Sequence, residues 1–460
     1  MSSKQRTTTL SLSPARQTLF ALGSGAFTLL ERLVIIYVPF YFLPPAEYRV
    51  HNLVPDRTFL GFVTVMGAAL VAGRVFDGIA DPVIAAMSDN NRSRVGRRKL
   101  FLLLSALPLA IFTILVFSPP HLGQESLLNG VWLGVMICLF YIAFTAYVNP
   151  YLVLISELGH SDAMRINLST RIAFFGLLGM VAVTVLFPEI VSRLQEAGME
   201  IRASYRAAVM GFAAISAILL YSATFSFDER LHCTPHQPMR IGMWYSLKKT
   251  FAFRSFRIFI AGEMFLQFAM NIFTMGMMYY AVVIFLRGQS FMTVIAGIMI
   301  GSALLTFPAV NLAAKRWGKK RVILMGMVIL TICSLSLFLL SFKMTGPYFY
   351  LGLIVLALAG LPLAVLTILI NPTIAEMARA EATRTGEARE AMFFGARAVP
   401  LKATIALAGA FFIFLISSFG KDAAEPLGVQ LSFLTVSIAG LGALLCFLRY
   451  PEEEVQKHLH

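Results

Sequence analysis

Long runs of apolar residues recur along the whole chain, and short polar stretches separate them. The runs are continuous rather than alternating, so they predict membrane-spanning helices and not the short alternating strands of a barrel. We expect an all-α membrane protein with twelve spans, at about residues 17–43, 58–87, 99–118, 130–157, 166–190, 204–226, 256–286, 291–314, 322–342, 348–374, 391–418 and 428–448.

The spacing of the runs divides the chain into two halves of six spans. We expect an N-terminal half, a cytoplasmic central loop, a C-terminal half and a cytoplasmic tail, at residues 1–226, 227–255, 256–448 and 449–460. Within the loop, residues 244–253 could form a short helix on the membrane face. The polar, basic N-terminus leads into a first span without a small-residue cleavage site, which predicts an uncleaved anchor.

Two basic loops occupy matching places in the two halves. Residues 92–99 and 315–321 each follow the second span of a half, and each combines a glycine with consecutive cations. Two six-helix repeats around a midplane site are the plan of the major facilitator superfamily. The alternative is that short cytoplasmic loops are basic in any protein of this kind.

Composition and charge agree with a membrane protein. The 460 residues are 58% hydrophobic and only 13% charged, which leaves too little charge for a soluble surface. The net charge of +14 is concentrated in alternate loops and in the tails, which indicates membrane orientation rather than nucleic-acid binding. We therefore expect a multi-pass protein of the cell (inner) membrane, in contact with membrane lipids, with both termini cytoplasmic.

Three charged residues of the second span lie on one helix face. Asp77 and Asp81 are four residues apart, and Arg74 precedes Asp77 by three. Ionised groups inside a span are costly and usually functional. The group needs one more positive charge than Arg74 supplies, and Na⁺, a proton or Lys402 of the eleventh span could provide it. The alternative is a static ion-pair network that only holds helices together.

Other polar residues of the spans are candidates for the same cavity. Lys402 lies near mid-membrane, where its ammonium group cannot easily reach the interface. Glu31 and Arg32 are adjacent, so they point in different directions, and an ion pair to another helix is as reasonable as a substrate contact. Asn149-Pro150 and Asn371-Pro372 match between the halves and could be kinks or gates. The candidates for lining a substrate cavity are Glu31, Asn149, Tyr280, Glu263, Thr367 and Arg397.

Other chemistry has little support in the sequence. A phosphate-binding loop with Lys-Ser/Thr is missing, which disfavours an ATP-driven pump. His232, Cys233 and His236 match no strong zinc spacing, and we interpret them as a solvated loop. The four cysteines indicate no disulfide framework. We expect no enzyme activity, no cofactor other than a co-transported Na⁺ or H⁺, no bound metal beyond Na⁺ at Asp77 and Asp81, and a monomer.

The motif Arg74-Val-Phe-Asp77-Gly-Ile-Ala-Asp81-Pro82, followed by the basic loop, resembles the signature of the glycoside–pentoside–hexuronide:cation symporters. Residues 375–395 resemble the stretch before the eleventh span of that family, and Tyr279-Tyr280 and Arg171 also fit. The resemblance implies that Asp77, Asp81 and Thr145 bind the cation. It also implies that Lys402 approaches the acidic pair and that Arg74 and Arg171 surround the site and its gate.

The sugar-binding positions of that family differ in this chain. Acidic residues of sugar-binding members are replaced by Leu30 and Val148, an aromatic platform by Leu152, and a tryptophan position by Thr367. A sugar needs acids for its hydroxyls and an aromatic face for its ring. The pattern is closer to relatives that carry lysolipids. Ala80 replaces an asparagine, which should weaken Na⁺ relative to H⁺.

These observations predict a secondary active symporter that works by alternating access. Cation flow through Asp77 and Asp81 would drive uptake of a glycoside-like or amphiphilic, lysolipid-like solute. The rivals are an uncoupled uniporter or lipid scramblase, in which the buried charges are purely structural, and a non-transporting membrane sensor.

Overall fold

The computed structural model describes residues 11–59, 63–233, 250–385 and 390–457. Eleven helices or helix runs among these residues are long and apolar enough to cross a membrane. Helix α2 (Val65–Asn90) is also of spanning length, but it carries Arg74, Asp77 and Asp81 in its middle. The eleven spans together with α2 agree with the twelve that the hydrophobic pattern predicts.

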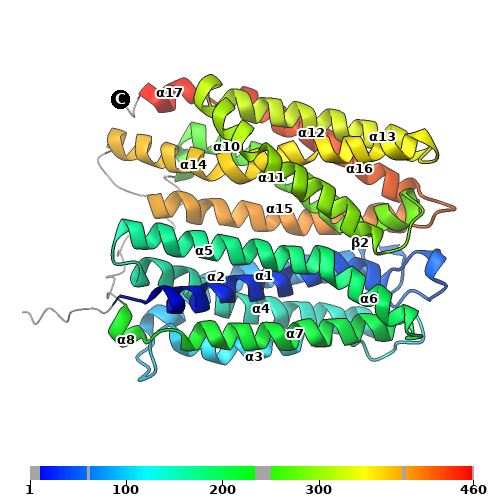
Figure 1. Ribbon diagram of the computed structural model, residues 1–460, viewed down its shortest axis with the longest axis horizontal. Helices are drawn as coiled ribbons and strands as arrows, with labels where there is room; N and C mark the ends of the chain where they lie inside the picture. Colours follow the sequence, from blue (N-terminus) through cyan, green and yellow to red (C-terminus); the bar gives the residue numbers. More distant parts are fainter. Residues whose placement is uncertain (1–10, 60–62, 234–249, 386–389, 458–460) are drawn as a thin grey trace, which may run out of the picture. The chain divides into compact units, whose positions relative to one another are not determined.

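The chain forms two compact units, one of residues 1–42 and 72–239 and the other of residues 43–71 and 240–460. Helix α2 begins in the second unit and continues in the first. The other elements of the first unit are α1 (Pro14–Phe42), α3 (Lys99–Val116), α4 (Leu127–Leu158), α5 (Asp162–Val181), a π-helical turn η2 (Ala182–Leu186), α6 (Phe187–Glu196), α7 (Ile201–Phe225) and α8 (Glu229–His232). In this unit α1 lies beside α5 and α7, and α3 lies beside α4 and α7 (Figure 1).

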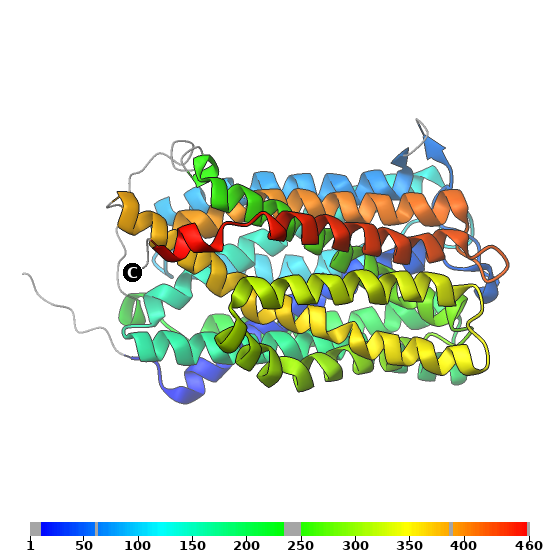
Figure 2. The same ribbon diagram turned by 90° about the horizontal axis from the view of Figure 1, so that it is seen from above.

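The second unit begins with a short polar segment and continues with long helices. The segment holds η1 (Ala46–Tyr48), β1 (Thr58–Phe59) and β2 (Val63–Thr64). The helices are α10 (Arg254–Tyr279) with a π-helical turn η3 (Tyr280–Ile284), α11 (Phe291–Trp317), α12 (Lys319–Ser341), α13 (Pro347–Leu358), α14 (Gly360–Thr385), α15 (Glu390–Phe419), α16 (Leu427–Leu448) and α17 (Glu452–Lys457). Helix α16, in orange-red, packs against α10 and α12 (Figure 2).

The beginning of the second span differs from the prediction. Residues 58–64 were expected to be helical, but β1 and β2 pair antiparallel there, with Thr58 opposite Thr64. The helix begins only at Val65, where the Thr64 hydroxyl accepts a hydrogen bond from the Gly67 N–H at 2.9 Å. A threonine in this place satisfies one of the free N–H groups of the first turn, so it fixes the start of the helix. Hydrophobicity does not reveal such a boundary.

Polar contacts explain why residues 43–71 belong to the second unit. Asp56 and Asn52 both contact the Lys421 ammonium, Asp56 as an ion pair and Asn52 at 2.9 Å. The Ala46 N–H donates to the Asp422 carboxylate at 2.6 Å. These contacts attach the segment after the first span to the turn between α15 and α16.

The basic loops make equivalent contacts in the two units. In the first unit, the Glu229 carboxylate of α8 accepts the N–H groups of Arg98 at 2.9 Å and Lys99 at 2.8 Å. In the second unit, the Glu452 carboxylate of α17 accepts the N–H of Lys320 at 3.2 Å. Each acid thus satisfies the first turn of the helix after its basic loop, where a negative charge is favoured.

A second acid in each unit binds the loop cations. Glu157, at the end of α4, pairs with Arg97 at 2.9 Å and also with Arg98. Glu376, in α14, pairs with Lys319. The matching contacts agree with the repeat that the two glycine-and-cation loops indicate. The suggested helix at residues 244–253 lies largely outside the described residues.

Candidate functional site

The charged group of α2 lies against α4 because a glycine allows the two helices to approach. A Cβ atom on Gly73 would lie 2.2 Å from the Ile137 side chain and 3.0 Å from the Tyr141 ring. A larger residue would therefore force the Ile137 side chain, or the helix that carries it, to move. Gly73 directly precedes Arg74, so this close approach brings the predicted charged face within reach of α4.

Asp77 is the buried centre of the group, with only 1% of the residue exposed. Its Oδ1 accepts a hydrogen bond from the Thr145 hydroxyl at 2.7 Å, and its Oδ2 lies 3.4 Å from Arg74 Nη1. The structure therefore brings together Asp77, Thr145 and Arg74, three residues that the sequence analysis assigned to one site.

The Arg74 guanidinium contacts two carboxylates, those of Asp77 and Glu31, and the aromatic ring of Tyr141. Its Nη2 lies 3.5 Å from Glu31 Oε1 of α1, and its guanidinium carbon lies 4.4 Å from the centre of the Tyr141 ring. Of the two alternatives for Glu31, the structure shows the ion pair to another helix. Tyr141 was not among the candidates, because one aromatic residue in an apolar span has no distinguishing pattern.

Asp81 lies one turn after Asp77 and is partly exposed. Its Oδ1 accepts a hydrogen bond from the Asn149 side-chain amide at 3.0 Å. Helix α4 continues through Pro150, so the Asn-Pro pair does not end the helix. Asn149 thus belongs with the acidic pair and not only with a possible kink.

The side chain of Arg171 contacts Thr18 and not the acidic residues of α2. Its guanidinium donates to the Thr18 hydroxyl, which links α5 to the first turns of α1. Its predicted part in a gate stays a prediction. Lys402 lies in α15 of the second unit, whereas Asp77 and Asp81 belong to the first, and the predicted approach of Lys402 to the acids also stays a prediction.

The second unit contains a separate buried ion pair. Both oxygens of the Glu263 carboxylate accept hydrogen bonds from Arg397 Nε at 2.9 Å, and Arg397 Nη1 donates to Asn371 at 2.9 Å. Two predicted cavity candidates, Glu263 and Arg397, thus bind each other, and together with Asn371 they connect α10, α14 and α15. Neither the spacing nor the type of these residues could show this pairing.

The two remaining cavity candidates differ in exposure. Tyr280 is fully buried, its hydroxyl is 2.8 Å from the Ser432 hydroxyl, and its ring stacks on Phe433. This places it in the packing between α10 and α16. Thr367 is exposed, and its hydroxyl donates to the Leu363 carbonyl one turn earlier.

The site offers oxygen ligands suited to a small cation. The carboxylates of Asp77 and Asp81 and the Thr145 hydroxyl supply hard oxygen atoms, which suit Na⁺, and either carboxylate could take a proton instead. Among the described residues, no group of three or more His, Cys, Asp or Glu side chains could hold a metal ion.

The interpretation of His232 and Cys233 as a solvated loop is wrong. His232 is the last residue of α8 and is buried, with Nδ1 hydrogen-bonded to the Asp228 carbonyl at 2.9 Å. Cys233 is also buried, and burial raises the pKa of its thiol. The short helix packs these residues against the end of the unit, which the polar sequence did not indicate. His236 lies outside the described residues.

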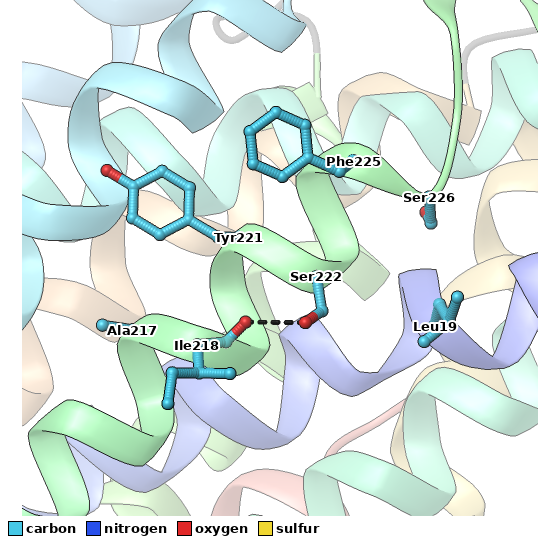
Figure 3. A pocket seen from close by; sticks show the side chains of 7 residues that line it. All are labelled: Leu19, Ala217, Ile218, Tyr221, Ser222, Phe225 and Ser226. Carbon is cyan, nitrogen blue, oxygen red and sulfur yellow. Dashed lines mark hydrogen bonds between the residues drawn. The ribbon is translucent and has the colours of Figure 1, made fainter.

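A cavity of about 580 Å³ opens on the first unit between α1 and α7. Figure 3 shows its lining, which is mostly apolar, with Leu19 on one side and Ile218, Tyr221 and Phe225 on the other. The Ser222 hydroxyl donates a hydrogen bond to the Ile218 carbonyl at 2.8 Å. None of the predicted site residues lines this cavity, so it is separate from the charged group.

The family follows from comparison with known proteins. Residues 19–450 match the family described as MFS/sugar transport protein. The chain belongs to this family. The match confirms the resemblance to the glycoside–pentoside–hexuronide symporters, and it agrees with the spanning helices of the structure.

Similar curated proteins are symporters and sugar transporters of bacteria. The isoprimeverose transporter of Lactiplantibacillus pentosus is 24% identical over 63% of this chain and 60% of that protein. The inner membrane symporter YicJ of Escherichia coli is 24% identical over 38% of this chain and 36% of that protein. An uncharacterized symporter of Synechocystis is 33% identical over 24% of this chain. The chain thus matches less than two thirds of the length of each of these relatives.

Solved structures show the same fold at low sequence identity. A bacterial homologue of the lysosomal transporter Spinster, in an inward-facing and unoccupied conformation, has a TM-score of 0.68 at 11% identity, covering 96% of this chain and 99% of that one. A D-xylose–proton symporter has a TM-score of 0.64 at 15% identity, covering 95% and 96%. Together with the spanning helices, these similarities establish the major facilitator fold.

Proposed function

We propose that this protein couples the entry of Na⁺ or H⁺ to the uptake of an organic solute across the cell (inner) membrane, with both termini cytoplasmic. The observation that carries the proposal is the environment of Asp77. This carboxylate is buried, takes a hydrogen bond from Thr145, and lies 3.4 Å from Arg74, which also lies 3.5 Å from Glu31. Carboxylate and hydroxyl oxygens held together in this way are hard ligands that suit a small cation.

Coupling follows if the cation and the solute both favour the same conformation. A ligand shifts a conformational equilibrium only through its differential affinity for the two states. A cation at Asp77 and Asp81 neutralises buried carboxylates, so its presence changes the cost of moving this region of α2. The solute is glycoside-like or amphiphilic, since sugar transport fits the family and the sugar acids are replaced by Leu30 and Val148.

The test is solute uptake into proteoliposomes under an imposed Na⁺ or H⁺ gradient. The solutes are isoprimeverose, phenyl glycosides and lysophospholipids. The expected result is accumulation in the wild type under at least one gradient. In Asp77→Asn, accumulation falls by a factor of roughly 100, since neutralising the buried carboxylate removes the cation ligand.

Asp89→Asn is the matched control. It changes the same residue type on the same helix, but Asp89 pairs with Arg98 beside the basic loop and is outside the proposed site. It should leave gradient-driven uptake intact. If neither gradient drives accumulation, or if Asp77→Asn behaves like the wild type, coupling at this site is wrong. Equilibration without accumulation would indicate a uniporter or scramblase.

A further inference from the structure

Arg32 is a cation deep within the first span. It lies ten residues before Phe42, the last residue of α1, and eighteen after Pro14, the first. At a rise of 1.5 Å per residue these separations are about 15 Å and 27 Å. The hydrocarbon core of a bilayer is about 30 Å thick, so this guanidinium cannot readily reach either surface.

The structure supplies no partner to Arg32 within the described part of the chain. Its Nε atom is buried and has no hydrogen-bond partner, and no ion pair joins it to an acid among the described residues. The residue as a whole is partly exposed, so the end of the guanidinium reaches accessible space. This combination differs from Arg74, which is surrounded by acids and a ring.

The acids near Arg32 already make other contacts. Arg32 follows Glu31 in α1, and the Arg74 guanidinium lies 3.5 Å from Glu31 and 3.4 Å from Asp77, so these charges belong to one neighbourhood. Glu31, adjacent to Arg32 in sequence, turns to Arg74, and Asp77 contacts Arg74 and Thr145. The neighbourhood therefore presents a guanidinium with free donors beside the proposed cation site.

A guanidinium without a partner at this depth is costly, and natural proteins place one there when something pairs with it. Its planar fork matches carboxylate, sulfate and phosphate groups with two parallel hydrogen bonds. We propose that Arg32 binds an anionic group of the transported solute, so the substrate is an organic solute or amphiphile with a carboxylate, sulfate or phosphate. This inference rests on the proposed transport function.

The experiment compares solutes that differ in one anionic group. One pair is phenyl β-glucuronide and phenyl β-glucoside, and the other is lysophosphatidic acid and monoacylglycerol with the same acyl chain. Binding is measured by isothermal titration of the purified full-length protein. Because a charge-assisted bidentate contact is strong, the wild type should bind the anionic member of at least one pair about 10- to 100-fold more tightly.

Substitutions of Arg32 test whether its positive charge causes the preference for the anionic solute. Arg32→Gln should remove the preference for the anionic member, and Arg32→Lys should retain part of it. Arg193→Gln is the matched control, because Arg193 is exposed in α6 and paired with Glu189. It should retain the full preference. The inference is overturned if the wild type favours neither anionic member, or if Arg32→Gln keeps the preference.

A measurement without solute tests the structural alternative. If Arg32 lacks a partner in the folded protein, Arg32→Gln should leave the melting temperature unchanged or raise it. If Arg32 holds helices together, the substitution should lower the melting temperature, and that outcome would also overturn the inference.

Cation binding distinguishes the failure of this inference from the failure of the transport proposal. Wild-type protein should be stabilised by Na⁺, and Asp77→Asn should lose this effect whichever solute binds. If this stabilisation is present but neutral and anionic solutes bind equally, only the role of Arg32 is wrong. If it is missing and no gradient drives uptake, the transport proposal fails as well.

Discussion

The buried ion pairs of the two units differ in the length of their contacts and in the number of partners of each arginine. In the first unit, Arg74 lies 3.4 Å from Asp77 and 3.5 Å from Glu31, and Glu31 is 21% exposed. In the second unit, both oxygens of the fully buried Glu263 bind Arg397 Nε at 2.9 Å, and Asn371 occupies another donor of the same arginine.

We propose that the first group can exchange partners and that the second cannot, because the contacts of Arg74 with Asp77 and Glu31 are long. Short, two-point contacts in a buried place are strong and specific, and breaking one partner leaves a charge uncompensated. We therefore expect the first group to govern ion coupling and the second to govern the packing of its unit.

The largest expected effect is on stability, from Glu263→Gln. Removing one partner of a buried ion pair typically costs about 3–5 kcal/mol, and the 18% exposure of the Arg397 side chain puts the expected loss at the lower end. Thermal unfolding in detergent should show a clear fall. The double variant Glu263→Leu with Arg397→Leu should recover much of the loss, and Asp77→Asn should lose far less. Equal losses in Asp77→Asn and Glu263→Gln would contradict the comparison.

An intermediate effect should come from the two asparagines at matching positions. Asn149 donates to the Asp81 carboxylate at 3.0 Å, whereas Asn371 accepts from Arg397 at 2.9 Å. A hydrogen bond to a charged group contributes about 1.5–3 kcal/mol. Asn149→Ala should therefore raise the cation concentration for half-maximal uptake by roughly 10-fold with little change in stability. Asn371→Ala should lower stability and leave the cation dependence intact, and the reverse pattern would be inconsistent with the assignment.

The smallest effect concerns the acids at the basic loops. Glu229 accepts two backbone N–H groups of the α3 N-terminus, and Glu452 accepts one at the α12 N-terminus. Loss of a capping acceptor costs about 0.5–2 kcal/mol. Glu229→Ala should therefore speed hydrogen exchange in the first turn of α3 more than Glu452→Ala does in that of α12. Faster exchange in α12 than in α3 would show that the single contact is the stronger one.

Most of the membrane-spanning helices could be predicted from the sequence because a bilayer imposes a simple rule. Spanning segments must be long and apolar, and their backbone groups must be satisfied within a helix, so hydrophobicity locates them without knowledge of packing. The expected end of the eleventh span at residue 418 lies one residue before Phe419, the last residue of α15. The start of α2 was missed, because the Thr64 cap and the β1–β2 pair are local polar features that hydrophobicity does not register.

Part of the site was also readable from one helix alone. The spacing of Arg74, Asp77 and Asp81 places them on one face of α2 whatever surrounds it. The choice of Thr145 came only from the family resemblance; the structure shows its hydroxyl 2.7 Å from Asp77, and its role as a cation ligand stays a prediction. The close approach at Gly73 and the ring of Tyr141 had no recognisable signal, because glycine and tyrosine are common in spans.

By itself the sequence determined the membrane helices, the charged face of α2 and the presence of two adjacent charges, Glu31 and Arg32, in the first span. Only the tertiary structure decided that Glu31 pairs with Arg74 and that Arg32 makes no ion pair with an acid among the described residues. The physical reason is that a helix fixes the direction of each side chain, but the partner on the next helix depends on how the helices pack. In our proposal, Glu31 supports the cation site through Arg74, and Arg32 binds the solute.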